Sequence, residues 1–230
     1  MTEYKCNECE SSFGSEESFN QHRKAKHGIQ EKHKSGGSGK IVIAVVLILI
    51  IVGGAYLFLN PPAKKEVKIV EVDHIEGSGQ IEIIEFSDFQ CPACGAAYPE
   101  IKKFMEQYGD KVKFAYRHFP LPNHQFAWKA GEASECADEQ GKFWEFHNKL
   151  FENQKVLNVD AIKSYAEQIG LDTEKFNSCL DSGKMSSKVS AGLSEGQSLG
   201  VDSTPTFFIN GEKYVGVQNF EKLKQITGVN

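Results

Sequence analysis

The middle of the sequence lacks charge altogether: residues 41–60 contain no Asp, Glu, Lys or Arg. This absence excludes a uniformly soluble protein. Proline is scarce, with 7 copies in 230 residues, and glycine, with 21, is far from the one residue in three of a collagen, so the chain is neither collagen-like nor wholly disordered. An excess of positive charge is missing too. The formal net charge of −5 excludes a polycation that coats nucleic acid.

The uncharged stretch predicts a transmembrane helix over residues 41–59. A helix of 19 residues is about 28 Å long, close to the hydrocarbon thickness of a bilayer of about 30 Å. A cleaved signal peptide is the main alternative, with Gly53 and Ala55 as a weak cleavage site. The long polar segment before the apolar run argues against it. We therefore expect an uncleaved signal anchor.

Lysine and arginine are more frequent before this stretch than after it. Upstream lie Arg23, Lys24, Lys26, Lys32, Lys34 and Lys40, and downstream lie Lys64, Lys65 and Lys68. Such a bias favours an N-terminus on the cytoplasmic side. The expected protein crosses the cell membrane once, with residues 1–30 cytoplasmic and residues 67–230 extracytoplasmic.

Residues 1–30 contain a pattern of metal ligands, namely Cys6, Cys9, His22 and His27. Two residues separate the cysteines, twelve lie between Cys9 and His22, and four separate the histidines. This is the ligand spacing of a tetrahedral Zn²⁺ site. Because a segment this short cannot bury enough core unaided, the metal must supply its folding energy.

Aromatic residues at fixed offsets from these ligands complete the pattern: Tyr4, Phe13 and Phe19. The segment resembles zinc fingers of the ββα class. The helix positions that read bases in such fingers would be Ser15, Ser18 and Gln21. None is Arg, and Glu16 and Glu17 would repel phosphate. We expect a protein partner, with nucleic acid as the alternative, and a flexible Gly/Ser linker over residues 31–40.

A second linker over residues 60–66 leads into a domain that spans residues 67–230. Apolar patterning predicts strands over 67–73, 81–86 and 112–116 and a helix over 101–108. The motif Cys91-Pro92-Ala93-Cys94 falls between the second strand and this helix. A βαβ context of this kind indicates a redox motif rather than a zinc clip.

The spacing of the motif assigns a role to each cysteine. Cys91 is expected at the helix start, where unpaired N–H groups and the helix dipole favour its thiolate. Cys94 would lie on the same helix face, within disulfide reach. Cys91 is thus the predicted reactive sulfur, and Cys94 resolves the mixed disulfide. A structural disulfide or half of a metal site is the alternative.

Residues 122–200 show helical periodicity and are predicted to form an inserted helical domain. Its aromatic residues, including Trp128 and Trp144, are expected to pack the insert rather than bind a cofactor. Ordinary packing or surface roles are expected for His118, His124 and His147. A hairpin is predicted from 207–210 and 214–217 with a turn at 211–213, followed by a helix over 220–226.

Three segments of the domain resemble the DsbA-like thioredoxin family, the extracytoplasmic thiol oxidases. Residues 84–94 look like its active-site strand and turn, 140–151 like its inserted helices, and 200–211 like its cis-proline loop. The resemblance covers most of the domain in the family's order. It implies an α/β protein with a thioredoxin fold and an inserted helical domain.

The resemblance also implies roles for single residues. Pro205 corresponds to the cis-proline that faces the CxxC motif, and Thr204 before it would tune the attacked sulfur. Glu85 matches a buried acid that exchanges a proton with Cys94, the alternative being a water-facing position at a strand edge. A second disulfide is implied between Cys136 and Cys179, with two buried thiols as the alternative.

One departure from the family pattern concerns the residue before the second cysteine. The best-known members carry His there, whereas this chain has Ala93. A protonated His would stabilise the Cys91 thiolate and make the disulfide more oxidising. Without it, the potential stays open between about −270 mV, as in thioredoxin, and about −120 mV, as in DsbA.

Cysteine chemistry agrees with the expected orientation, because zinc thiolates suit a reducing cytosol and disulfides persist outside. We therefore expect a membrane-anchored thiol-disulfide oxidoreductase that forms disulfides in reduced extracytoplasmic proteins. A quinone-linked membrane oxidase would recycle it, and no organic cofactor is implied. One alternative is a disulfide reductase or isomerase. Another is a binding or sensor protein that uses the finger, with the outer domain as its receptor.

Overall fold

The computed structural model describes residues 3–28, 38–59, 67–70 and 74–230. The chain divides into two compact units, Met1–Ala63 and Lys64–Asn230. The predicted linker over 60–66 lies outside the described residues, as does most of the linker predicted over 31–40.

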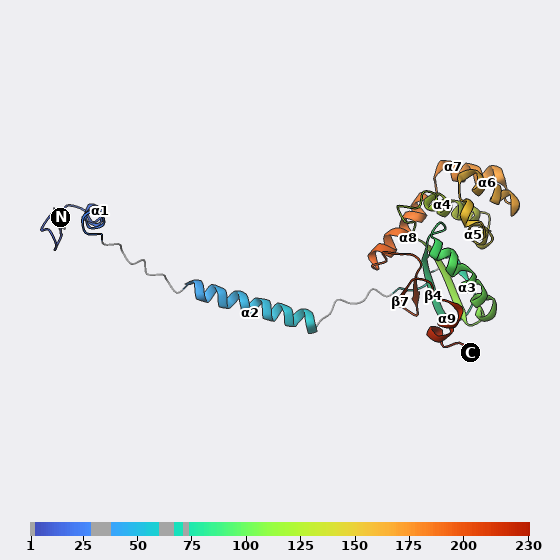
Figure 1. Ribbon diagram of the computed structural model, residues 1–230, viewed down its shortest axis with the longest axis horizontal. Coiled ribbons are helices and arrows are strands. Elements are labelled where there is room, and N and C mark those ends of the chain that lie inside the picture. Colours follow the sequence, from blue (N-terminus) through green and yellow to red (C-terminus); the bar gives the residue numbers. More distant parts are fainter. Residues whose placement is uncertain (1–2, 29–37, 60–66, 71–73) are drawn as a thin grey trace. The chain divides into compact units, whose positions relative to one another are not determined.

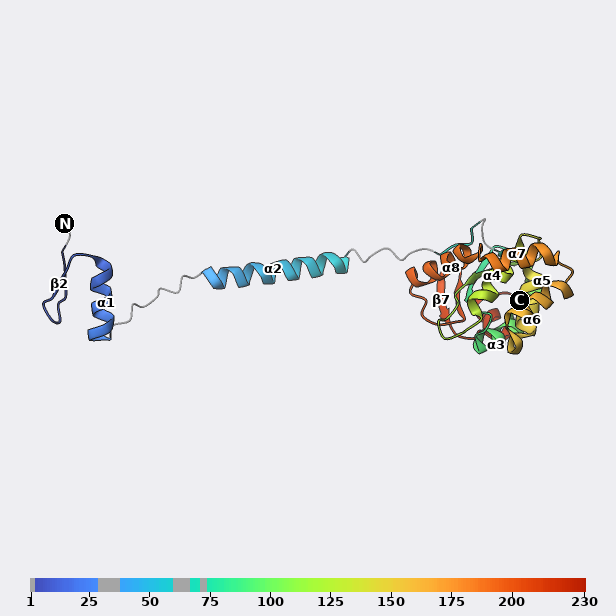
Figure 2. The ribbon, with the colours of Figure 1, turned by 90° about the horizontal axis from the view of Figure 1, so that it is seen from above.

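The N-terminal segment forms a small hairpin beside a helix (Figure 2). Strands β1 (Tyr4–Lys5) and β2 (Ser12–Phe13) pair in antiparallel fashion, and α1 (Glu16–His27) follows. Ser15 caps the start of α1, because its side chain accepts a hydrogen bond from the Ser18 N–H. The Phe19 ring lies 6.0 Å from the rings of Tyr4 and Phe13, so the three aromatic residues form one contact set.

Helix α2 (Ser38–Leu59) includes the uncharged stretch over 41–59. Large apolar side chains along it are exposed, among them those of Leu49, Ile51 and Phe58. Among the residues that the structure describes, no helix has the length and apolar character required to pass through a membrane.

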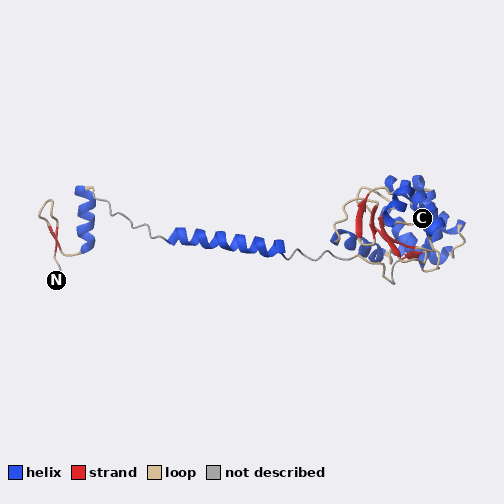
Figure 3. Cartoon of the chain, turned by 90° about the horizontal axis from the view of Figure 1, so that it is seen from below, coloured by secondary structure: helices blue, strands red, loops and turns tan. Residues whose placement is uncertain are grey.

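The second unit is built around a five-stranded mixed sheet with the order β3-β5-β4-β6-β7 (Figure 3). Its strands are β3 (His74–Glu76), β4 (Ile81–Ser87), β5 (Val112–His118), β6 (Thr206–Ile209) and β7 (Glu212–Val215). The central pair β4 and β5 is parallel, and all other neighbours are antiparallel.

Successive side chains of β4 point to opposite faces of the sheet, and helices cover both faces. Ile83 packs with Ile101 and Phe104 of α3 (Pro92–Tyr108), and α9 (Phe220–Thr227) adds to the same cluster. Ile84 and Phe86 face the other way, toward a cluster that includes side chains of α8 (Ser186–Ser198). Helices α3 and α8 accordingly lie on opposite sides of β4 (Figure 1).

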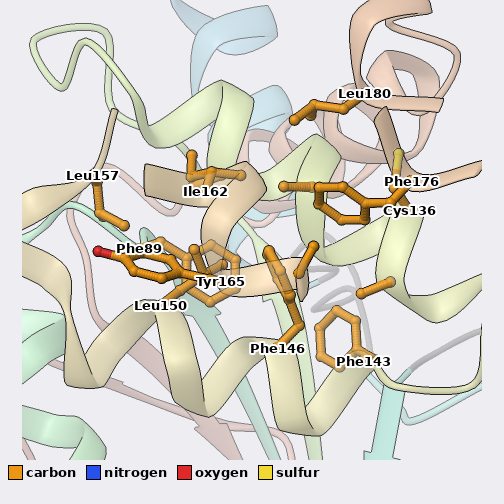
Figure 4. Close-up of a cluster of buried hydrophobic side chains, with 14 of the residues drawn as sticks. Phe89, Cys136, Phe143, Phe146, Leu150, Leu157, Ile162, Tyr165, Phe176 and Leu180 are labelled. Atoms are coloured by element: carbon orange, nitrogen blue, oxygen red, sulfur yellow. The ribbon is translucent and has the colours of Figure 1, made fainter. Parts of the chain in front are cut away.

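Between β5 and β6 the chain forms the inserted helical domain, which confirms the predicted fold class of a thioredoxin fold with a helical insertion. The insert consists of α4 (Ala127–Asp138), α5 (Phe143–Glu152), η1 (Gln154–Val156), α6 (Val159–Gln168), α7 (Thr173–Ser182) and α8. Figure 4 shows its core, in which Phe89 of the active-site turn packs among side chains of α5 and α6. The insert therefore contacts the motif directly.

Three predicted elements differ from the structure. Residues 67–70 form no strand, and 71–73 lie outside the described residues; the edge strand begins only at His74. Side chains, rather than a neighbouring strand, form hydrogen bonds with the backbone of this segment. Arg117 Nη2 donates to the Lys68 carbonyl at 2.8 Å, and the Ile69 N–H donates to Glu82 at 3.4 Å.

The hairpin turn also lies one residue earlier than predicted. Ile209 pairs with Glu212, so the turn consists of Asn210 and Gly211. Their φ angles of +47° and +82° fit a two-residue turn of the type that Asn-Gly favours in β-hairpins. The helix predicted over 101–108 is longer than expected, because α3 begins directly at Pro92.

Candidate active site

Cys91 is the N-cap residue of α3, and Pro92 is the first residue of the helix. The proline fits there because the first helical N–H groups have no partner within the helix. The Cys91 thiol is only 6% exposed and donates a hydrogen bond to the Thr204 carbonyl oxygen at 3.4 Å. The reactive sulfur thus lies between the helix start and the loop that precedes β6.

The two sulfurs of the motif differ strongly in acidity. A hydrogen bond from the Cys94 thiol, helped by Thr204 and the N–H groups of Ala93 and Cys94, lowers the pKa of Cys91 to about 5. Burial acts in the opposite direction but does not prevail. Burial raises the pKa of Cys94 well above its ordinary value, and the nearby Cys91 and Glu85 add to that effect. Cys91 is therefore the thiolate at neutral pH, and Cys94 keeps its proton.

The loop that faces the motif contains a cis peptide bond between Thr204 and Pro205. The Pro205 carbonyl accepts a hydrogen bond from the Gly216 N–H at 2.8 Å, which ties the loop to the end of β7. The Thr204 hydroxyl is buried without a partner among the described residues. It is therefore free to donate to the Cys91 sulfur once that sulfur is ionised.

Glu85 lies on β4, on the sheet face that α3 covers. It is 3% exposed, which excludes the water-facing alternative. Burial raises the pKa of its carboxyl group to about 7. Ser87 shares this face two residues on, and Tyr116 of β5 is paired with Glu85 in the parallel register.

These three side chains share an unusual property. Glu85 Oε1, Ser87 Oγ and the Tyr116 hydroxyl are buried without a hydrogen-bond partner among the described residues. Tyr116 and Cys94 belong to one buried cluster, so the polar atoms lie in the layer beneath the second cysteine. Buried polar atoms of this kind are few in folded proteins, and a catalytic role is one explanation for them.

Two residues that hold the active-site turn were not identified from the sequence. The Asp88 carboxylate accepts hydrogen bonds from the N–H groups of Gln90 at 2.7 Å and Leu121 at 2.8 Å, and it contacts His124 Nδ1 at 2.7 Å. Gln154 of the insert donates from Nε2 to the Cys91 carbonyl at 2.8 Å. The only sequence signal was that Asp88 and Gln90 lie within the segment that resembles the family's active-site turn.

The remaining cysteines of this unit are Cys136 on α4 and Cys179 on α7, and they form a disulfide. This is the pairing implied by the resemblance, so the alternative of two buried thiols does not hold in the structure. His147 is buried among aromatic rings, and burial lowers its pKa to about 3, so it packs as a neutral side chain.

His118 is buried and has a carboxylate partner. Its ring lies 2.8 Å from Glu135 on α4, which is also contacted by His74 of β3. Burial opposes ionisation of Glu135, but hydrogen bonds from His118 and His74 hold its pKa well below the usual range. The sequence analysis did not single out His74 or Glu135.

In the N-terminal segment the four expected zinc ligands lie together. One ligand atom from each of Cys6, Cys9, His22 and His27 is within 4.8 Å of the others, and Cys9 Sγ is 3.0 Å from His22 Nε2. His27 Nδ1 contacts Glu8 at 2.8 Å, whereas its Nε2 is buried without a partner among the described residues. That arrangement leaves Nε2 available for a metal, so the residues fit Zn²⁺.

Relatives of known sequence match about two thirds to three quarters of this chain. The Na(+)/H(+) antiporter NhaA 3 of Salinispora tropica is 35% identical over 154 residues, covering 66% of this chain and 24% of the antiporter. NhaA 1 of Mycolicibacterium vanbaalenii is 31% identical over 189 residues, covering 76% of this chain and 31% of the antiporter. The chain therefore spans a quarter to a third of the length of these relatives.

Solved structures with the same fold include a thioredoxin-like oxidoreductase from Silicibacter pomeroyi, with 24% identity, a TM-score of 0.62 and coverage of 68% of this chain and 90% of that one. Wolbachia pipientis alpha-DsbA1 shows 23% identity and a TM-score of 0.63, with coverage of 70% and 92%. Bacillus subtilis BdbD shows 24% identity and a TM-score of 0.60, with coverage of 68% and 91%.

The family model that matches the chain is described as thioredoxin and covers residues 77–227, the stretch that contains strands β4 to β7, the CPAC motif and the cis-proline loop. This chain belongs to the thioredoxin family.

Proposed function

We propose that the protein is a membrane-anchored thiol-disulfide oxidoreductase that forms disulfides in extracytoplasmic proteins through its CPAC motif. The observation that carries the proposal is the difference between the two sulfurs. Cys91 ionises easily at the helix start, whereas Cys94 is buried and holds its proton. A pair of this kind exchanges disulfides through the sulfur that ionises more easily.

The oxidising reaction starts from the Cys91–Cys94 disulfide. A substrate thiolate attacks the Cys91 sulfur and forms a mixed disulfide, and Cys94 leaves as a thiolate that takes up a proton. A second substrate thiolate then attacks the substrate sulfur of the mixed disulfide. Cys91 leaves as a thiolate, which its low pKa favours. The substrate gains a disulfide, and the two electrons remain on the Cys91–Cys94 pair.

Glu85 is the group that supplies and removes the Cys94 proton in this proposal. Its raised pKa of about 7 lets it hold either protonation state near neutral pH. The Ser87 hydroxyl lies on the same face of β4 and gives the proton a route between the acid and the sulfur. The reacting groups are thus enclosed beneath α3, away from bulk water.

Residues Thr204 and Pro205 position the substrate. The Thr204 carbonyl already accepts a hydrogen bond from the Cys91 thiol, and the extended strand β6 begins at Thr206, directly after Pro205. A substrate strand that pairs there would place its own sulfur next to Cys91. This proposal predicts that substrates bind as extended chains with little dependence on side chains beyond the reacting cysteine.

Oxidation of reduced ribonuclease tests the proposed activity. The wild-type chain with its Cys91–Cys94 disulfide formed should restore ribonuclease activity, and Cys91→Ser should abolish the reaction. Cys94→Ser cannot form that disulfide and should also fail to oxidise ribonuclease, but its Cys91 thiolate should attack a disulfide-containing protein and remain trapped as a mixed disulfide. Unchanged oxidation by Cys91→Ser would instead favour a binding or sensor protein. Equilibration with glutathione separates the oxidase from the reductase or isomerase alternative, because a potential near about −270 mV would identify a reductant.

We also propose that the N-terminal segment is a Zn²⁺ finger held by Cys6, Cys9, His22 and His27. The ion would supply the free energy that folds a segment too short to fold alone. The exposed face of α1 would bind a protein partner. Two tests apply: chelation should unfold residues 3–28 only, and tight, salt-dependent binding of DNA would favour the nucleic-acid alternative.

The proposed location is the cell membrane, with the finger cytoplasmic and the thioredoxin unit extracytoplasmic. The uncharged run over 41–59 and the lysines before it support this topology. Re-oxidation by a quinone-linked membrane oxidase would complete the cycle. Resistance to alkaline extraction and protease access to residues 67–230 from outside the cell should both be observed. Release by alkali would exclude the anchor.

A further inference from the structure

Three side chains from distant parts of the second unit lie together: His74 of β3, His118 of β5 and Glu135 of α4. His74 Nε2 lies 2.7 Å and His118 Nε2 lies 2.8 Å from the same oxygen, Glu135 Oε1. Ligand-type atoms of all three residues lie within 4.8 Å of one another. The cluster is largely buried, with side-chain exposures of 12%, 6% and 3%.

Neighbouring residues fix the orientation of each member. The His74 ring stacks on Phe143, with ring centres 3.5 Å apart and an angle of 6° between the rings. Glu135 Oε2 pairs with Lys188 at 2.8 Å, so Oε1 alone is directed at the two imidazoles. Rings and carboxylate held in this way form a pre-organised set of donors, with little entropy left to lose on binding.

We propose that His74, His118 and Glu135 bind a divalent transition-metal ion of the Zn²⁺ class. Two imidazoles and one carboxylate are a ligand set that such ions favour and that Ca²⁺ and Mg²⁺ do not. Three protein ligands with a fourth position left for water are typical of an open zinc site.

The geometry requires only a small adjustment. Bonds of about 2.0–2.1 Å to a tetrahedral ion set neighbouring ligand atoms about 3.3 Å apart. The two imidazoles are now 2.7 and 2.8 Å from Glu135, so each contact must open by roughly half an ångström. A cavity of about 340 Å³ adjoins the cluster and is lined by all three residues, which leaves room for a fourth ligand.

The groups that surround the cluster also suit a bound metal ion. A histidine that binds metal through Nε2 must carry its proton on Nδ1, and a carboxylate commonly accepts that proton. His74 Nδ1 lies 3.5 Å from Asp138 Oδ1, one turn after Glu135 on α4. Lys188 would stay on the second oxygen of Glu135 and keep that carboxylate monodentate.

A bound ion would join the edge strand β3, the central strand β5 and the first helix of the insert. It would therefore stabilise the packing of the insert against the sheet. His74 and Glu135, which it would connect, are 61 residues apart in the sequence. The alternative is a metal-free cluster in which Glu135 simply accepts hydrogen bonds from both histidines and from Lys188.

The test uses the full chain in detergent with Cys6→Ser and Cys9→Ser, which remove the finger thiolates. Its Cys91–Cys94 pair is oxidised, so that none of the six cysteines remains a thiolate. Titration with Co²⁺ alone should give about one bound equivalent with visible d–d absorption and no thiolate charge-transfer band. Zn²⁺ should displace Co²⁺ and raise the unfolding temperature.

Variants of the cluster decide between the two accounts. In the same background, His74→Asn and Glu135→Gln should each lose the Co²⁺ spectrum and the thermal shift with Zn²⁺. His124→Asn is the matched control, because this histidine contacts Asp88 instead, and it should bind Co²⁺ as before. No Co²⁺ binding in the background chain would overturn the proposal. Unchanged binding by both cluster variants would overturn it as well.

Discussion

Gln154 Nε2 lies 2.8 Å from the carbonyl oxygen of Cys91, so the helical insert holds the reactive turn by a side chain far away in the sequence. The same amide donates to the Phe89 carbonyl at 3.0 Å. A Cβ atom at Gly95 would come within 2.3 Å of the Gln154 side chain, which explains why a glycine follows the motif. The insert therefore supports the geometry of the active site.

Replacement of Gln154 tests this support. Gln154→Ala removes two hydrogen bonds to the turn, and we expect the free energy of unfolding to fall by about 1–3 kcal/mol. Oxidation of reduced ribonuclease should also slow, because the turn is less well ordered. Gln140→Ala is the matched control: it removes two hydrogen bonds to Asp172, remote from the motif. Equal activity of the two variants would contradict the supporting role.

Glu85→Gln should slow the reverse of the first proposed step, in which Cys94 attacks the mixed disulfide and releases the substrate thiolate, by about 100-fold or more, because the base that takes the Cys94 proton is lost. The wild-type rate should rise through pH 7, where the buried carboxyl ionises, and the variant should lack this rise. Stopped-flow measurements of mixed-disulfide resolution against pH check both points. A variant that keeps the inflection would exclude Glu85 as the base.

The same substitution should change stability in a pH-dependent way. The folded pKa of Glu85, about 7, lies above its ordinary value of 4.5. At pH 4 the carboxyl group is largely neutral in both states, so its ionisation hardly affects the free energy of unfolding. Above pH 7 the buried charge lowers that free energy by the full equivalent of the pKa shift. We expect Glu85→Gln to stabilise the fold at pH 8 by up to about 3 kcal/mol and to have no such benefit at pH 4. Urea unfolding at both pH values measures it, with Glu82→Gln on the same strand as control.

Thr204→Val should make Cys91 less acidic. The Thr204 hydroxyl has no other partner among the described residues and helps to lower the pKa of Cys91. Its loss should move the midpoint of the alkylation profile upward by about one pH unit, the equivalent of one hydrogen bond to a charged group. Ser203→Ala, whose hydroxyl bonds to Asp202, should leave the midpoint unchanged.

The disulfide between Cys136 and Cys179 should contribute to stability without taking part in the reaction. It closes a loop with a sequence separation of 43, for which chain entropy gives about 4 kcal/mol. The double variant Cys136→Ser/Cys179→Ser should lose about that much free energy of unfolding in urea and still oxidise ribonuclease at 25 °C. Loss of oxidation by a folded double variant would show that this pair exchanges electrons with the motif.

Local sequence patterns predicted the features that depend on residues close together in the chain. The dense apolar run of β4, the position of Cys91 at a helix start and the ligand spacing in residues 1–30 depend on neighbours in the chain, and each was visible in the sequence. The cis peptide bond at Pro205 and the disulfide came instead from the family resemblance.

The contacts that the sequence did not show depend on tertiary structure. Gln154 reaches Cys91 across 63 positions, and His74 reaches Glu135 across 61. No spacing rule identifies such partners. Residues 67–70, the described part of the strand predicted over 67–73, form no strand for a similar reason, because the side chains of Arg117 and Glu82 satisfy backbone groups that a ladder would otherwise use.

The most direct test of the central claim is the pH dependence of alkylation at Cys91 in the reduced protein, followed by peptide mass mapping. The lowered pKa predicts a midpoint near pH 5 and rapid modification at neutral pH, where Cys94 stays unmodified. A midpoint near 9, the ordinary value of a cysteine thiol, would contradict the proposed reaction at its first step.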